Sequence, residues 1–268
     1  MEAKLKGELG DLLYDACQKG DLEAVKGTIC QLQASNPTYE PPFPSILHGA
    51  ISKDRANVVK YCLDHSTPVT AEMMRIILIN KAKDVYKLLL DTNAIDVNYY
   101  IPWFGDILSN AATHDDFEMA TICLCHGADP NANLVDEHMS ILAAVAELAS
   151  VDMARLLLKH GARLGGSGAI VKAAEAGKLE MVRVLLEEGA DVNEVGIEHP
   201  TDPRYKEDMG TALHRAVVEG HEEIVRFLLA HEAVVSSEDP LGRTPLALAM
   251  DTGNDVICSL LREQSGSS

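Results

Sequence analysis

Two stretches near the C-terminus repeat each other 33 residues apart, and this period constrains the fold more than any other feature of the sequence. The segment GTALHRAVVEGHEEIVRFLLAHEAVVS at 210–236 aligns with GRTPLALAMDTGNDVICSLLRE at 242–263, and Thr211 then matches Thr244. A fixed period of this size is typical of chains that stack one supersecondary unit after another. The sequence therefore predicts a repeat architecture.

The same frame returns upstream with decreasing fidelity. Small residues, an apolar pair and LL-x-x-G-A recur at 168–193, 140–164 and 106–131, and weaker copies lie at 45–66, 74–98 and 11–29. We expect about eight repeats in a single domain, 1–268, with a loop insertion at 196–209. Their approximate ranges are 8–33, 44–68, 69–98, 103–133, 138–165, 166–195, 208–237 and 241–263. In the first repeat the predicted helix GDLLYDACQKG follows a charged lead-in. The first and last repeats both have the polar character of caps.

Each repeat has the composition of two short helices. Ala173 and Ala174 are small enough for a first helix to approach its neighbour closely. Val182 and Leu186 belong to an apolar stripe with helical spacing, and Gly189 follows where a glycine ends such a helix. A pair of this kind cannot bury its apolar face alone. Stacked pairs form one continuous core, which predicts an all-α solenoid with short hairpin fingers along one edge.

The motifs GRTPLALA and EEGADVN resemble the ankyrin-repeat pattern G-x-T-P-L-H-x-A-A-x-x-G-H-x-x-V-V-x-x-L-L-x-x-G-A-D-V-N, and the resemblance covers nearly the whole chain. It implies a non-catalytic protein–protein interaction module, of the adaptor, scaffold or inhibitor type, that binds through its fingers and its concave face. Fold does not fix function, and two alternatives stay open. The groove could bind or transform a small molecule, or the chain could be a structural subunit of a larger complex.

One predicted finger has an unusual composition. The segment YYIPWFG at 99–105 keeps the ordinary spacing, ten residues from Asn98 to Leu108. It contains four of the twelve aromatic residues of the chain, Tyr99, Tyr100, Trp103 and Phe104. Packing against a neighbouring finger is one interpretation, but exposed Trp and Tyr are the residues that most often become interface hot spots. We expect these four to contact a partner.

Other junctions depart from the frame in length. The insertion at 196–209 would overhang a ligand in the groove, or would be a passive surface loop. The junctions at 161–170 and 65–74 are too short for a full hairpin, and the row of fingers should be interrupted there.

First-helix positions that face away from the packing side should line the concave face with a polar stripe of mixed sign. They are Asn110, His114, Glu147, Lys172, Glu175, Arg215, Glu219 and Asp251. A partner-contacting surface and a solvated face are the main interpretations. If the chain is an enzyme, the candidates are His114, Glu147, Lys172 and Glu175. Successive repeats lie about 10 Å apart, too far for proton exchange between helices unless long side chains converge.

Two histidines and a C-x-C pair have structural interpretations. His48 and His214 occupy the T-P-L-H position, where the ring should hydrogen-bond neighbouring loop backbone. Cys123 should lie in the core and Cys125 should be exposed, because the two point to different helix faces. The repeat frame places no third ligand beside them, and we expect no metal and no cofactor.

The net charge of −18 decides which partners are expected. Nucleic acids and acidic membrane surfaces would be repelled, whereas a basic protein would be attracted. No apolar run is long enough to span a bilayer, the N-terminus lacks a signal-like apolar segment, and the six cysteines fit reduced thiols. These features favour the cytoplasm or the nucleus.

Overall fold

A computed structural model describes residues 2–102, 104–135, 139–196 and 210–265 of the chain. The chain divides into two compact units, Met1–Ile107 and Leu108–Ser268. Each unit is a succession of short antiparallel helix pairs, and the all-α repeat fold predicted from the period is confirmed.

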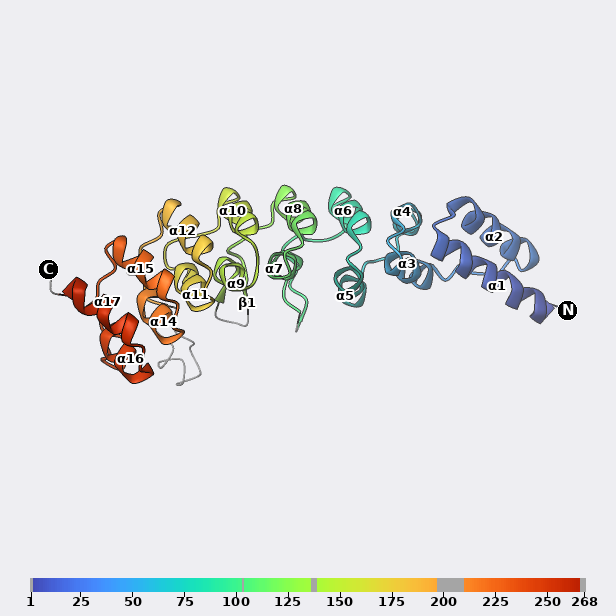
Figure 1. The fold of residues 1–268 in the computed structure, drawn as a ribbon. Coiled ribbons are helices and arrows are strands. Elements are labelled where there is room, and N and C mark those ends of the chain that lie inside the picture. Colours follow the sequence, from blue (N-terminus) through green and yellow to red (C-terminus); the bar gives the residue numbers. More distant parts are fainter. Residues whose placement is uncertain (1, 103, 136–138, 197–209, 266–268) are drawn as a thin grey trace. The chain divides into compact units, whose positions relative to one another are not determined.

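The first unit contains two parallel rows of helices. Its elements are α1 (Glu2–Lys19), α2 (Leu22–Ser35), α3 (Phe43–Ser52), α4 (Ala56–Asp64), α5 (Ala71–Asn80) and α6 (Lys83–Asp91). The first helices of the pairs, α1, α3 and α5, contact one another in order, and so do the second helices α2, α4 and α6 (Figure 1). Within this unit, each pair therefore stacks on the next.

The second unit continues the pattern. Its helices are α7 (Ile107–Thr113), α8 (Phe117–Cys125), α9 (Ile141–Leu148), α10 (Val151–Lys159), α11 (Ala169–Glu175), α12 (Leu179–Glu187), α14 (Ala212–Val218), α15 (Glu222–Ala230), α16 (Pro245–Thr252) and α17 (Asp255–Ser265). Two rows of contacts run through this unit (Figure 1). One row joins the first helices α9, α11, α14 and α16 in order, and the other joins the second helices α10, α12, α15 and α17. A two-stranded antiparallel hairpin, β1 (Leu134–Val135) with β2 (Met139–Ser140), precedes α9.

A helix pair lies at each predicted repeat range, while the number of true repeats and the single domain stay predictions. The two short junctions are as expected. Between Lys159 and Ala169, and between Asp64 and Ala71, the chain turns without forming a strand.

The first helix is longer than predicted. The sequence indicated a helix limited to GDLLYDACQKG after a charged lead-in, but α1 already begins at Glu2. Glu, Ala, Lys and Leu are strong helix formers, and Gly7 and Gly10 cost only about 1 kcal/mol each. The lead-in is therefore helical.

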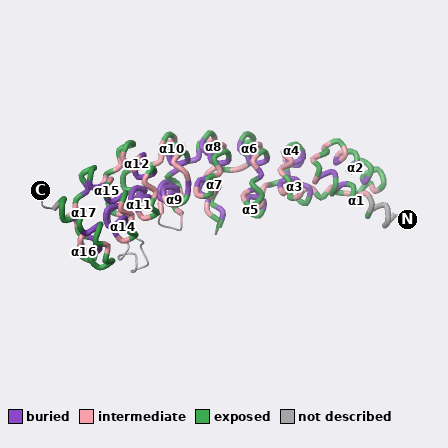
Figure 2. The backbone as a smooth tube through the Cα atoms, in the orientation of Figure 1, coloured by how far each residue is buried: buried purple, intermediate pink, exposed green. Residues whose placement is uncertain are grey.

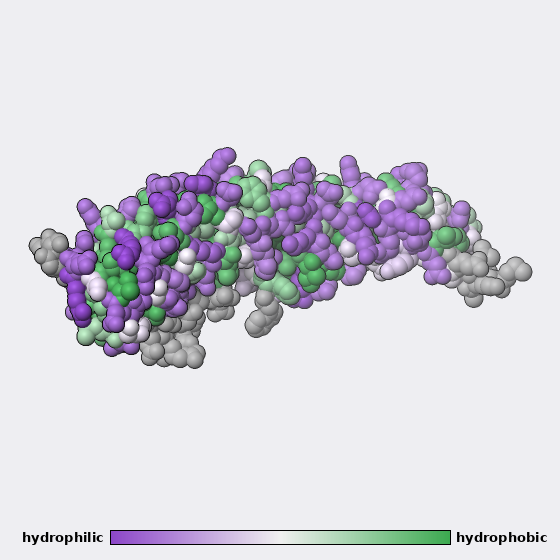
Figure 3. Space-filling view, viewed as in Figure 1, coloured by the Kyte–Doolittle hydropathy of each residue, from purple (hydrophilic) through white to green (hydrophobic). Residues whose placement is uncertain are grey.

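The core consists of small and aliphatic side chains. Buried positions recur along the helix pairs (Figure 2). Leu185, Val225 and Leu228 of the predicted apolar stripe are fully buried, and so is Ala216, one of the small first-helix residues. Hydrophilic residues cover most of the face shown in Figure 3, with smaller hydrophobic areas between them. Burial of the stripe, rather than the propensity of helices this short, stabilises each pair.

Polar side chains at the start of second helices join neighbouring pairs in the second unit. Lys178 donates a hydrogen bond from Nζ to the Ala149 carbonyl oxygen over 2.8 Å. The Nε2 of His221 lies 3.0 Å from the Glu175 carbonyl oxygen, and its ring sits against Gly177. Gly177 has φ +72°, and a Cβ there would come within 2.8 Å of the His221 ring, so this contact requires glycine.

Candidate functional site

Hydrogen bonds fix the backbone of residues 99–105, the aromatic finger. The Ile101 N–H donates to the Gly105 carbonyl oxygen, and the Phe104 N–H donates to the Ile101 carbonyl oxygen, each over 2.9 Å. Pro102 occupies the second position of the resulting turn, which suits its fixed φ. Ile101 is fully buried and anchors the turn.

Three aromatic side chains of the finger are exposed. Tyr99, Tyr100 and Phe104 have exposed fractions of 38%, 49% and 42%. The Arg75 guanidinium carbon lies 5.9 Å from the centroid of the Phe104 ring, a cation–π contact with the preceding helix pair. Trp103 lies outside the described residues. The structure therefore presents at least three aromatic side chains to solvent, and their role as partner contacts stays a prediction.

The predicted stripe of polar first-helix residues contains a continuous series of ion pairs, which we call the charged row: Glu147 on α9, Lys172 and Glu175 on α11, Arg215 in the last turn of α14 and Glu219 just after it. The Lys172 Nζ lies 3.6 Å from a Glu147 carboxylate oxygen and 3.0 Å from one of Glu175. The Arg215 guanidinium lies 2.8 Å from Glu175 and 3.4 Å from Glu219. Three successive helix pairs are thus linked by their long side chains.

The charged row bears on two expectations. Contact between successive repeats was expected only if long side chains converge, and Lys172 and Arg215 are long enough to reach the carboxylates of the neighbouring helix. Only 6% of the Arg215 side chain is exposed, and its role as a partner contact stays a prediction. The carboxylates of Glu147 and Glu219 are more accessible than the cations between them. A partner would therefore meet charges that already pair with each other.

The other stripe residues lie outside this chain of contacts. His114 follows α7, and its Nδ1 lies 2.9 Å from the carbonyl oxygen of Asn110 on the same helix. Asp251 is exposed on α16. Of the four residues considered for catalysis, the structure brings together Glu147, Lys172 and Glu175 in ion pairs, and it turns His114 to its own helix.

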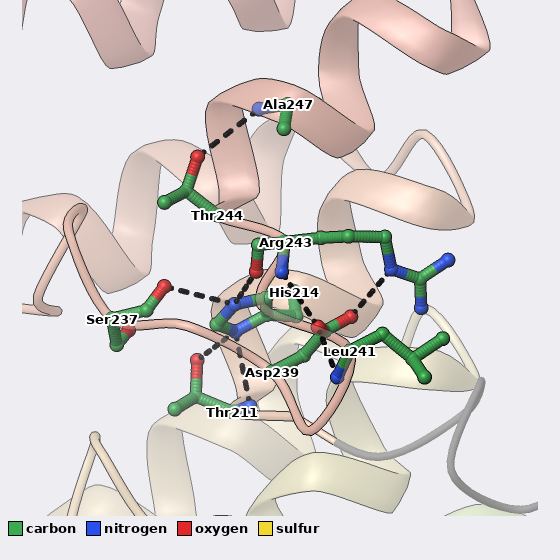
Figure 4. A network of polar contacts seen from close by, with 8 residues as sticks. All are labelled: Thr211, His214, Ser237, Asp239, Leu241, Arg243, Thr244 and Ala247. Atoms are coloured by element: carbon green, nitrogen blue, oxygen red, sulfur yellow. Dashed lines mark hydrogen bonds and ion pairs between the residues drawn. The ribbon is translucent and has the colours of Figure 1, made fainter.

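His214 is the centre of a polar network that joins the last two helix pairs (Figure 4). Its Nδ1 accepts a hydrogen bond from the Thr211 N–H over 3.1 Å. The Nε2 must then carry the proton, and it lies 3.1 Å from the Ser237 carbonyl oxygen and 3.2 Å from that of Arg243. Burial lowers the pKa of His214, although the carbonyl contacts and Asp239 oppose the shift. The neutral ring therefore makes the backbone contacts that were predicted for it.

Asp239 organises the loop beside His214 (Figure 4). Its carboxylate accepts hydrogen bonds from the N–H groups of Leu241 and Arg243 and from the Arg243 Nε, over 2.9, 2.8 and 2.7 Å. Burial alone would raise the pKa of Asp239, but these hydrogen bonds and the Arg243 charge outweigh it, and the pKa lies below its ordinary value.

His48 does not repeat this arrangement, although it holds the same motif position. Its side chain is exposed. The junction that follows its helix pair, 65–70, is too short to form the hairpin whose carbonyl oxygens surround His214. The expected structural role is therefore wrong for His48 and right for His214.

The cysteine prediction is confirmed, since Cys123 is buried and Cys125 is exposed. Among the described residues, no group of three His, Cys, Asp or Glu side chains could hold a metal ion. Within the same part of the chain, no helix is both long and apolar enough to cross a membrane.

The predicted insertion 196–209 is closed at its base. The Gly196 N–H donates to the Gly210 carbonyl oxygen over 2.9 Å, and Val195 forms an antiparallel bridge with Thr211. Residues 197–209 lie outside the described residues, and whether the insertion overhangs a ligand stays a prediction.

The sequence patterns did not predict one surface feature, a groove. A groove of about 600 Å³ lies between α8 and α10. Its lining residues are Asp115, Phe117, Ser150, Asp152, Arg155, Leu156 and Lys159. The available signal was Phe117, an aromatic residue at the start of a second helix, where other repeats have a smaller apolar residue such as Leu179 or a charged one such as Glu222.

Residues 108–195 and 197–268, more than half of the chain, match the family model for ankyrin repeats, with three copies. The chain belongs to the ankyrin-repeat family. Ankyrin repeats are generally non-catalytic protein–protein interaction modules, and the second unit, which holds the charged row and the groove, lies within the matched ranges.

Similarity to curated proteins is local. The potassium channel AKT1 of Oryza sativa, in both the indica and japonica subspecies, is 43% identical over 61 residues. This segment is 23% of the ankyrin-repeat chain and only 6% of the channel. The chain thus matches a small fraction of the channel's length, and the channel's function is not transferred to it.

Proposed function

We propose that this ankyrin-repeat chain is a non-catalytic binding module whose aromatic finger contacts a protein partner. The observation that carries the proposal is the exposure of Tyr99, Tyr100 and Phe104 on a turn whose backbone is hydrogen-bonded and whose Ile101 is buried. Aromatic side chains held in place contribute large contact areas with little loss of conformational entropy.

The contribution proposed for the charged row and its neighbours is smaller. Asn110, His114, Glu147, Lys172, Glu175 and Glu219 remain candidate contacts, together with the mostly buried Arg215. Because the ion pairs of the row are already formed, a partner gains little by replacing them. The net charge of −18 would steer a basic partner toward the chain. We place this binding in the cytoplasm or nucleus, where reduced cysteines are stable.

The finger is tested by comparing two exposed tyrosines of the first unit. Tyr100→Ala removes a finger side chain, and Tyr14→Ala removes one that is 67% exposed on α1. Affinity capture with the wild-type chain, followed by mass spectrometry, identifies candidate partners, and titration calorimetry then measures their Kd. We expect Tyr100→Ala to weaken binding by about 2 kcal/mol, roughly thirtyfold in Kd, and Tyr14→Ala to leave it unchanged.

The melting temperature separates binding from folding in both variants. Because Tyr100 is half exposed, its removal should leave the melting temperature nearly unchanged. A large drop would show that the side chain belongs to the core, and equal binding by the two variants would remove the finger from the interface.

A further inference from the structure

The groove between α8 and α10 has an unusual distribution of charge for so acidic a chain. Arg155 and Lys159 lie one helical turn apart on the same face of α10, and both side chains are exposed. Neither has an ion pair among the described residues. Like charges at this i, i+4 spacing repel each other by a few tenths of a kcal/mol. An anionic group between them would be attracted to both cations and would offset their mutual repulsion.

The apolar part of the groove comes from both helices. Phe117 is the first residue of α8 and is 48% exposed, and Leu156 of α10 is half-buried. Other second helices of the second unit start with smaller or polar residues, such as Val151 or Glu222. A ring exposed to this degree beside two cations offers both an apolar contact and a charged contact to one ligand.

The acidic residues of the groove belong to its other end. Asp115 accepts hydrogen bonds from the N–H and the hydroxyl of Ser150, over 3.2 and 2.7 Å, so its carboxylate is already engaged. Asp152 lies in the first turn of α10, where a carboxylate meets the favourable end of the helix dipole. Asp152 and Lys159 are seven positions apart, about 10 Å along the helix, whereas Arg155 follows Asp152 by less than one turn. Lys159 therefore lies apart from the acidic residues, and Arg155 lies between the two ends of the groove.

We propose that this groove is a second interaction surface, which binds an acidic, partly apolar peptide segment of a partner protein. An aliphatic or aromatic side chain of the segment packs on Phe117 and Leu156, and its carboxylates lie between Arg155 and Lys159. The groove is open to solvent rather than enclosed, which suits a peptide better than a small molecule. This surface is independent of the aromatic finger, which lies in the other unit.

The test uses the full chain and four fluorescent probes in anisotropy titrations. Three are twelve-residue peptides: one of Glu, Leu and Phe, one of Glu and Ser, and one of Lys, Leu and Phe. The fourth is a labelled single phenylalanine with a free carboxylate. We expect the Glu, Leu and Phe peptide to bind best. The double variant Arg155→Ala/Lys159→Ala and the single variant Phe117→Ala should each raise its Kd by about tenfold or more.

Matched variants make the outcome decisive. Arg163→Ala/Arg226→Ala removes two exposed cations elsewhere in the second unit and should change the Kd less than about twofold. Tyr100→Ala, in the aromatic finger, should not change it at all, so failure of one proposal leaves the other standing. Equal loss in both double variants would show general charge attraction. Indifference to Phe117→Ala, or better binding of the Glu and Ser peptide, the basic peptide or the single amino acid, would also overturn the proposal.

Discussion

The charged row and the groove lie in the same unit and use their cations in opposite ways. Arg215 of the row is almost completely covered and pairs with Glu175 over 2.8 Å. Arg155 and Lys159 of the groove are exposed, and no ion pair is formed with either within the described residues. Paired, covered charge holds neighbouring repeats in register, whereas unpaired, exposed charge is available to a ligand. The two surfaces therefore differ in role although their composition is similar.

The largest expected effect comes from breaking the charged row at its buried member. Arg215→Ala should lower the free energy of unfolding by about 2 to 3 kcal/mol, because it leaves two carboxylates without their shared cation and opens space under α14. Urea unfolding followed by circular dichroism measures the change. A loss below about 0.5 kcal/mol, the usual range for a surface substitution, would show that the row does not stabilise the stack.

A second comparison sets the two motif histidines against each other. His214→Asn should cost about 1 to 2 kcal/mol at pH 7.5, because the buried Thr211 N–H and the part-buried carbonyl groups of Ser237 and Arg243 lose a partner. His48→Asn, at the same motif position but exposed, should cost almost nothing. Urea titrations of both variants and the wild type provide the measurement.

The same variants report on pH. The folded-state pKa of His214 lies below its ordinary value of 6.5, so the unfolded chain binds more protons as the pH falls below that value. The stability contributed by neutral His214 is complete above pH 6.5 and is lost as the pH falls through the folded-state pKa. The wild type should thus lose more stability than His214→Asn between pH 7.5 and pH 5. Parallel pH dependences for these two proteins would contradict the neutral assignment.

The sequence predicted the fold because the determinants of an ankyrin-type stack are local and periodic. Small residues such as Ala216, apolar pairs such as Val225 and Leu228, and the glycines recur in one frame, and burial follows from that frame. The length of the junctions was equally informative. It predicted where hairpins are missing, and a missing hairpin is also why His48 lacks the contacts of His214.

The candidate sites were predictable only in part. Position in the repeat placed Lys172 and Arg215 on the right helices. Which carboxylates they contact depends on the length and direction of their side chains, and the spacing between helices does not predict these contacts. The groove lies between two helices of neighbouring pairs, and residues as distant in sequence as Phe117 and Lys159 line it together. Such surfaces arise from tertiary packing and leave only an isolated exposed ring as a signal.

The smallest expected effect is also the sharpest test of the difference between the two surfaces. Arg155→Ala should change the free energy of unfolding by less than about 0.5 kcal/mol, and a slight gain is expected because the repulsion from Lys159 disappears. Urea unfolding in the buffer used for Arg215→Ala measures it, at low and at moderate salt. If Arg155→Ala were as destabilising as Arg215→Ala, the groove cations would be structural, and their availability to an acidic ligand would lose its basis. A neutral result together with a weakened Kd for the acidic, apolar peptide would instead show charge kept for binding.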